Sequence, residues 1–402
     1  MTNPFGIPFE FILFGLMLLG VALFHRRALT ISVLGLVLIL AFEAFVTSFP
    51  TGRGAGALAT HVAHEWVIIA NLFLLLVGFE LLSNQFEQSN VSDHLPNLLP
   101  DGWLGGVVLL SVIFVLAAFL DNIAAAVLGG VMARHVFKGR VTVAFLAALV
   151  AASNAGGAGS VIGDTTTTIM WLEGVSPVAL LPAYFAAVPA FIIVAIFGAM
   201  AQHRHQPCLD HDEPGHPLMW RRIAIVAFIL AAAVAANVLA NTLSHGEETA
   251  PWLGLALWAA ILVTSLAAKP DWSVIRHGAK GAIFLSALVA AASLMPLRGL
   301  PEPAWQTAFG LGLLSSVFDN IPLTALALRQ GGYDWGLLSF AVGFGGSMIW
   351  FGSSAGVALT NVYDEGRSVL RWIKEGWFVP VAYVAGFFVM LLAFGWNPTF
   401  HP

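Results

Sequence analysis

Three aspartates lie within long apolar stretches of this sequence, each beside other oxygen-bearing side chains. Asp121-Asn122 and Asp319-Asn320 are matching pairs, and Asp164 precedes a run of threonines. An ionised carboxyl at the centre of a bilayer costs about 2.5–3.5 kcal/mol, so three of them would cost about 8–10 kcal/mol. No Lys or Arg lies in the interior of a predicted span to neutralise them. Each carboxyl must therefore hold a proton or a cation, and alternation between the two is the chemistry of ion exchange.

Glycine pairs and further oxygen donors accompany the aspartates. The pairs Gly156-Gly157 and Gly345-Gly346 predict helix breaks, which leave backbone groups unpaired at membrane depth and are tolerated only where they line a cavity. Carboxylate, hydroxyl and carbonyl oxygens together suit a hard cation. The predicted ion-binding residues are Asp121, Asn122, Ser153, Asn154, Asp164, Thr165, Asp319, Asn320, Ser347, Ser353 and Ser354. Among these we expect Asp164, Asn154 and Asp319 to hold Na⁺.

Other interpretations of the polar residues stay open. Asp and Asn are favoured helix N-caps, which would account for one Asp-Asn pair but not for its recurrence. Asp121 and Asp164 could share a proton, as the dyad of an intramembrane aspartyl enzyme does. A threonine such as Thr166 often forms an interhelical hydrogen bond. Glu43 and Glu80 lie outside the repeated motifs, which favours an interfacial or structural role for them.

The composition places most of the chain in lipid. The 402 residues are 58% hydrophobic and 10% charged, whereas soluble domains carry about 25% charged residues. The net charge of −5 provides no basic field for a nucleic-acid partner. The single cysteine, Cys208, excludes an intramolecular disulfide. No basic region precedes the apolar stretch 8–24, so we expect a retained helix and not a removed signal peptide.

A helix needs about 20 apolar residues to cross the hydrocarbon, and the sequence predicts an all-α membrane protein with ten spans. The stretches 103–138 and 303–328 are each divided by an Asp-Asn pair and are predicted re-entrant hairpins. Glycine-rich polar sequence interrupts 141–171 and 335–361, which are predicted broken helices. The predicted spans are 8–24, 28–47, 66–82, 141–171, 177–201, 222–241, 252–268, 281–297, 335–361 and 376–396.

The distribution of Lys and Arg predicts the orientation, because short cytoplasmic loops are enriched in both. With the N- and C-termini outside and each hairpin returning to its own side, only Arg53, Arg298 and Arg329 face outward. The cytoplasmic residues are then Arg26, Arg27, Arg134, Lys138, Arg140, Arg204, Arg221, Arg222, Lys269, Arg276, Lys280, Arg367, Arg371 and Lys374. We therefore expect a multi-pass protein of the cell membrane.

The two halves of the chain repeat one another. Residues 1–201 and residues 222–402 each hold five spans and one hairpin, in the same order. Because five is odd, the second half must enter the membrane inverted, with its hairpin opening to the other side. Inverted repeats with broken helices are the architecture of secondary transporters. The segment 202–221 is a predicted cytoplasmic linker, and we expect the histidines within 203–216 to be solvated and not metal-bound.

Four segments closely resemble the signature regions of the NhaD-type sodium/proton antiporters. They are residues 119–122, 153–167, 319–323 and 345–356. That family belongs to an ion transporter superfamily that includes arsenite, citrate and dicarboxylate carriers. The resemblance implies a homodimer in the lipid bilayer, a scaffold domain with a moving transport domain, a monovalent cation as substrate and no cofactor.

The hairpin tips distinguish two branches of that superfamily. The sodium-coupled dicarboxylate carriers have neutral Ser-Asn-Thr tips, whereas the Asp-Asn tips of this chain would repel an anion and attract a cation. We therefore expect exchange of Na⁺ or Li⁺ for H⁺, and no enzyme activity. The alternative is a carrier of an organic anion such as citrate, coupled to Na⁺ or H⁺, in which Asn122, Asn154 and Asn320 hold the substrate.

Overall fold

The computed structural model describes residues 8–24, 27–45, 54–90, 99–208, 217–243, 250–296 and 300–398. Within these ranges the chain is mainly helical and contains no β-strand, and an isolated bridge joins Gly102 to Cys208. The predicted all-α fold class is therefore confirmed. Two histidines of the linker, His211 and His216, lie outside the described residues.

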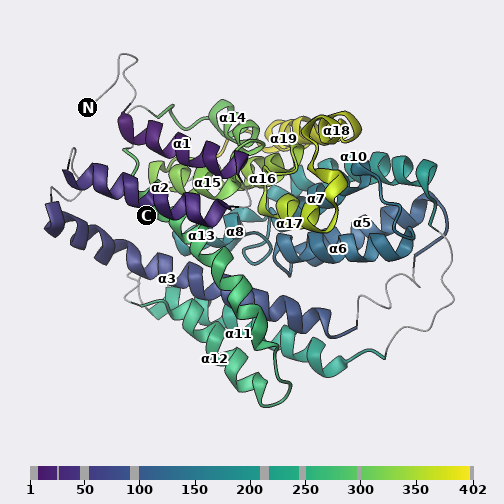
Figure 1. Ribbon diagram of the computed structural model, residues 1–402, viewed down its shortest axis with the longest axis horizontal. Helices are drawn as coiled ribbons and strands as arrows, with labels where there is room; N and C mark the ends of the chain where they lie inside the picture. The colour runs from purple at the N-terminus through teal and green to yellow at the C-terminus, as the bar shows by residue number, and fades with distance from the viewer. Residues whose placement is uncertain are drawn as a thin grey trace.

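Each half contains the same order of elements, namely three helices, a helix pair, a broken helix and a long final helix (Figure 1). The first half contains α1 (Phe9–Leu23), α2 (Ala28–Phe45), α3 (Gly54–Glu87), α5 (Trp103–Ala117), α6 (Asn122–Val136), α7 (Val143–Gly157), α8 (Thr165–Leu172), α9 (Pro177–Leu180) and α10 (Ala183–His205). The second half contains α11 (Trp220–Leu243), α12 (Trp252–Ser265), η3 (Trp272–Val274), α13 (Ile275–Ser293), α14 (Trp305–Ser315), α15 (Asn320–Gln330), α16 (Trp335–Gly345), η4 (Gly346–Met348), α17 (Ser354–Val362), η5 (Asp364–Arg367), α18 (Val369–Glu375) and α19 (Phe378–Phe394).

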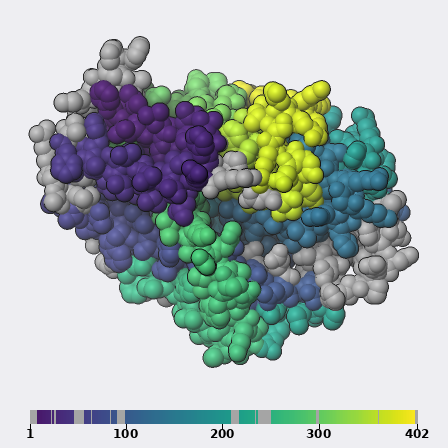
Figure 2. Space-filling model, in the orientation of Figure 1, coloured from purple at the N-terminus to yellow at the C-terminus, as the bar shows by residue number. Residues whose placement is uncertain are grey.

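The helices assemble into two groups, and each group draws on both halves. The α3 group consists of α1, α2, α3, α11, α12 and α13, with α3 packed against the last three. The α7 group consists of α5–α10 and α14–α19, with α10 packed along both α7 and α19. The groups meet where α3 contacts α6 and α8 and where α13 contacts α15. Figure 2 shows the purple amino-terminal segment and the yellow carboxy-terminal segment exposed on the same face of the molecule.

Several described helices are long and apolar enough to cross a membrane. By length and composition these are α2, residues 65–86 of α3, residues 177–205 and residues 272–293, which makes four in the described parts of the chain. The pair α18–α19, bent by 61°, is a fifth candidate. Both helices of the first hairpin and the first part of each broken helix are shorter apolar helices. Hairpins and broken spans require short helices of this kind. The ten-span topology stays a prediction.

Two helices extend well beyond their predicted spans. α3 begins at Gly54, whereas its span was predicted from residue 66, and α13 begins at Ile275, whereas its span was predicted from residue 281. Hydropathy identifies the part of a helix that suits hydrocarbon, whereas backbone hydrogen bonding continues the helix past it. As a result Arg276 and Lys280 are helical residues and not loop residues.

One glycine in each broken helix lets that helix pack closely against the helix pair before it. A methyl group on Gly156 would overlap the carbonyl oxygen of Phe114 in α5, and one on Gly345 would overlap that of Gly312 in α14. These neighbours are backbone atoms, so they cannot rotate away. The helix breaks predicted at these glycine pairs are present, since α7 ends at Gly157 and α16 ends at Gly345.

We expect Gly156→Ala to destabilise the protein by about 1–3 kcal/mol, because α7 and α5 must separate to admit the methyl group. The midpoint of thermal unfolding in detergent, followed by tryptophan fluorescence, measures the loss. Gly310→Ala in α14 is the matched control, since a methyl group there meets no atom within 4 Å. Equal midpoints for the two variants would show that the close approach is not required.

Candidate ion-binding site

All three aspartates of the predicted site begin helices. Asp121 accepts a hydrogen bond from the Ile123 N–H (3.2 Å) at the start of α6. Asp319 accepts one from the Ile321 N–H (3.1 Å) at the start of α15. Asp164 caps α8 in the same way, through Oδ1. In each case capping uses one carboxylate oxygen, so it is compatible with ion binding by the other.

One amide side chain joins the two helix breaks. Asn154 accepts a hydrogen bond from Asn122 Nδ2 (3.0 Å) and donates to Ser347 Oγ (2.9 Å) and Ser353 Oγ (3.2 Å). All four side chains are buried. Asn122 and Asn154 belong to the first half of the chain and the two serines to the second. The network therefore ties the halves together at the crossing of their broken helices.

A second network surrounds Asp164. Its Oδ1 accepts hydrogen bonds from the Thr166 N–H (2.9 Å) and hydroxyl (2.7 Å), and Asn320 Nδ2 donates to that hydroxyl oxygen (2.8 Å). Asp164 is 1% exposed, yet its Oδ2 has no hydrogen-bond partner within the described residues. A buried carboxylate oxygen without a partner requires an explanation, and a bound proton or cation supplies one.

Side chains already satisfy several carbonyl groups at the first helix break. The Tyr184 hydroxyl donates to the Gly156 carbonyl (2.9 Å), and the Ser339 hydroxyl donates to the Ala158 carbonyl (2.5 Å). Two threonines of α8 donate to carbonyls of the connecting loop in the same way. These carbonyls are thus less available to a cation than the broken helix alone suggests. The carboxylate, amide and hydroxyl oxygens are the main donors.

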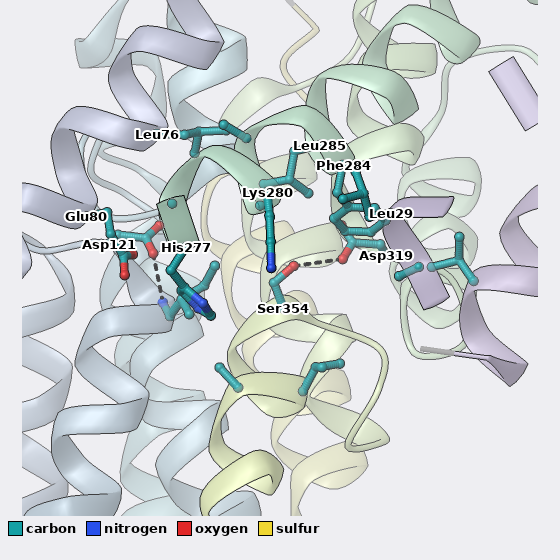
Figure 3. Close-up of a pocket in the computed structure, with 18 of the residues that line it drawn as sticks. Leu29, Leu76, Glu80, Asp121, His277, Lys280, Phe284, Leu285, Asp319 and Ser354 are labelled. Carbon is teal, nitrogen blue, oxygen red and sulfur yellow. Dashed lines mark hydrogen bonds between the residues drawn. The ribbon is translucent and has the colours of Figure 1, made fainter. Parts of the chain in front are cut away.

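A pocket of about 600 Å³ lies between the two helix groups and reaches both hairpin tips. Asp121 and Asp319 line it, and so does Ser354, whose hydroxyl donates to Asp319 Oδ2 (3.0 Å) (Figure 3). Asp164 is not among the described residues that line the pocket, but the charges of Asp121 and Asp319 both act on it. The aspartates therefore form two layers, with two at the pocket wall and one buried behind them.

Four ionisable residues of this pocket are absent from the predicted site, namely Arg27, Glu80, His277 and Lys280. Glu80 of α3 lies beside Asp121, and the two charges interact (Figure 3). His277 and Lys280 of α13 also line the pocket. The rule that an intramembrane acid is functional by default would have identified Glu80. No sequence signal identifies Lys280, because its place in the pocket depends on where α13 begins and how it packs.

Some predicted residues play a local part in the structure. Ser153 donates to the Val150 carbonyl (3.0 Å) in its own helix, and Thr165 is buried in the first turn of α8. Within the described ranges no three His, Cys, Asp or Glu side chains converge to hold a metal ion. No hydrogen bond joins Asp121 to Asp164 in those ranges, so the geometry of a proton-sharing dyad is not seen. A cation bound at Asp164 would therefore need neutral oxygen atoms as further ligands.

Comparison with known proteins gives two matches over most of the chain. The first is Sodium/proton antiporter 1 of Arabidopsis thaliana, which is 24% identical over 397 residues, covering 87% of this chain and 66% of that protein. The second is the Na(+)/H(+) antiporter NhaD of Vibrio parahaemolyticus, which is 24% identical over 351 residues, covering 74% of this chain and 83% of that protein. The chain is similar to NhaD-type sodium/proton antiporters.

A shorter match agrees with these two. The Na(+)/H(+) antiporter NhaD of Vibrio cholerae is 34% identical over 95 residues, which is 23% of this chain and 20% of that protein. No known family model matches the chain. The similarity to antiporters and the apolar helices together make this a multi-pass membrane protein.

We expect Asn154→Ala to destabilise the protein by about 1–3 kcal/mol, because it leaves buried polar groups of both halves without partners. The unfolding midpoint in detergent measures the effect. Ser111→Ala is the matched control, since among the described residues the Ser111 hydroxyl bonds only to the Val107 carbonyl of its own helix (2.9 Å). If the two variants unfold alike, Asn154 does not hold the broken helices together.

Proposed function

We propose that this protein is a secondary active transporter that exchanges Na⁺ or Li⁺ for H⁺ across a cell membrane. Asp164 carries the cation and the proton in turn, because either one neutralises the same buried carboxylate. Asp121 and Asp319 pass ions between the pocket and Asp164. The names of the two long matches, which are sodium/proton antiporters, support this pair of ions.

The unpartnered Oδ2 of Asp164 is the observation that carries the proposal. It lies in the α7 group where the two broken helices cross, and its carboxylate is held in place through Oδ1. An ionised carboxylate in this setting is costly unless a cation neutralises it. Na⁺ prefers hard oxygen ligands of this kind, and Asn154 and Asp319 remain the further ligands that we expect. No cofactor is needed, because the ions are the substrates.

The arrangement of the two helix groups suggests how the site reaches both sides of the membrane. The pocket separates residues of the α3 group from the acids of the α7 group. We infer that the α3 group stays fixed in the bilayer while the α7 group moves the site, in an elevator-type motion. The matching order of elements in the two halves supports inverted repeats of residues 1–201 and 222–402, joined by the linker 202–221.

The proposal also includes the orientation of the protein in the membrane and its oligomeric state. The positive-inside rule favours termini outside the cell membrane and re-entrant hairpins at 103–138 and 303–328. The homodimer follows from the resemblance to the antiporter family. The exposed apolar side chains of α2, which include Leu34, Val37 and Leu38, suit contact with lipid or with a second copy.

A carrier of an organic anion is the second candidate. Arg27, His277 and Lys280 line the pocket, and its volume of about 600 Å³ is ample for a small carboxylate. The acids of the opposite wall argue against it, because they would repel that substrate. Transport assays separate the two functions directly.

In proteoliposomes with an imposed pH gradient, we expect Na⁺ or Li⁺ to dissipate the gradient without any organic anion, and we expect Asp164→Asn to abolish this effect. Asparagine keeps the Oδ1 acceptor that caps α8 but can neither ionise nor exchange a proton. Fluorescence of a trapped pH indicator gives the rate.

Thr307→Val is the control for reconstitution, since the Thr307 hydroxyl forms an exposed hydrogen bond to the Glu302 carbonyl (2.7 Å) and no other within the described residues. Uptake of citrate or a dicarboxylate without proton release driven by Na⁺ would contradict the exchange and favour the anion carrier.

Gly343→Ala should raise the KM for Na⁺ about tenfold, which corresponds to about 1.4 kcal/mol of lost binding free energy. A methyl group on Gly343 would lie 3.1 Å from Asp164 Oδ2 and would meet no other atom within 4 Å in the described parts of neighbouring elements. The substitution therefore crowds the proposed ligand without disturbing the packing. Gly310→Ala serves as the control again, and an unchanged KM in Gly343→Ala would place the cation elsewhere.

A further inference from the structure

The pocket between the helix groups has two walls of different chemistry. The α7 group contributes Asp121, Asp319 and Ser354 to one wall. The opposite wall, from α3, α13 and the residue before α2, contributes Lys280, His277 and Arg27 together with the acid Glu80. A cation in this pocket therefore lies near the basic side chains of Arg27 and Lys280 as well as the acids.

The packing of α13 against α3 determines the position of Lys280 in the pocket. α3 and α13 cross at Gly278, where a Cβ would lie 3.0 Å from the Cβ of Glu80. This close approach sets the position of the α13 backbone two residues before Lys280. Figure 3 shows the Lys280 ammonium directed toward Ser354, which itself donates a hydrogen bond to Asp319.

The ammonium is free to move within the pocket. Lys280 is exposed, and in the described part of the chain no carboxylate lies within ion-pair distance of it. A lysine side chain is a hydrated point charge on a flexible stem, so it can approach or leave an acid at little cost. It can therefore neutralise the pocket acids when no transported ion is present.

We propose that Lys280 is a tethered counter-ion of the empty site, which Na⁺ or Li⁺ displaces from Asp319 as it binds. The proposal rests on the exchange function proposed above. Two cations cannot neutralise one carboxylate at the same time, so the ammonium competes with the substrate. The protein thereby keeps the empty pocket close to neutral and binds Na⁺ less tightly than its acids alone would.

The KM for Na⁺ at a fixed alkaline pH tests this competition. We expect Lys280→Gln to lower the KM about fivefold, the upper range for an exposed charge pair, and Lys280→Arg to stay near the wild-type value. Arg276→Gln is the matched control, because Arg276 is an exposed cation of the same helix and does not line the pocket. A KM that is unchanged in Lys280→Gln, or lowered equally in Arg276→Gln, would overturn the proposal.

A binding measurement separates this proposal from the function on which it rests. Stabilisation of the protein in detergent by NaCl against choline chloride reports Na⁺ affinity without transport. Tighter Na⁺ binding in Lys280→Gln supports the counter-ion even if wild-type proteoliposomes exchange no protons, which would defeat only the exchange function. A wild-type protein that binds no Na⁺ would overturn both proposals.

Discussion

At membrane depth every helix end must find its hydrogen-bond partners inside the protein, and two broken helices create such ends in the middle of this molecule. Asp164 caps one restarted helix and Ser353 caps the other. Side chains such as Tyr184 and Ser339 satisfy carbonyls that the first break exposes. Asp164 Oδ2 differs from these paired groups, because it is a buried carboxylate oxygen with no hydrogen-bond partner among the described residues, and the proposed ion site follows from it.

The halves of the chain complete each other at the crossing. Asn154 of the first half holds Ser347 and Ser353 of the second, and Asn320 of the second half reaches Thr166 beside Asp164 of the first. Each half thus adds hydrogen bonds from its own side chains to the break of the other half.

Much of this arrangement could be predicted from the chain. Glycine pairs and Asp-Asn pairs disrupt otherwise apolar stretches, and each disruption coincides with a real helix end, as at Gly157, Gly345, Asp121 and Asp319. Local sequence decides such ends, because capping and close backbone approach depend on the residue types at the break itself. The aspartates of the proposed ion site were predictable for the related reason that charge is rare in lipid.

The sequence by itself determined that this is an all-helical membrane protein with acids at interruptions of its apolar stretches, where helices begin. Only the tertiary structure decided that Asp164 is buried behind a pocket lined by Asp121 and Asp319, and that Glu80 and Lys280 line that pocket too. Hydropathy placed Lys280 outside the span, whereas α13 in fact begins before it. The physical reason is that composition reports which solvent a segment prefers, while the distance between two side chains depends on how helices remote in sequence pack together.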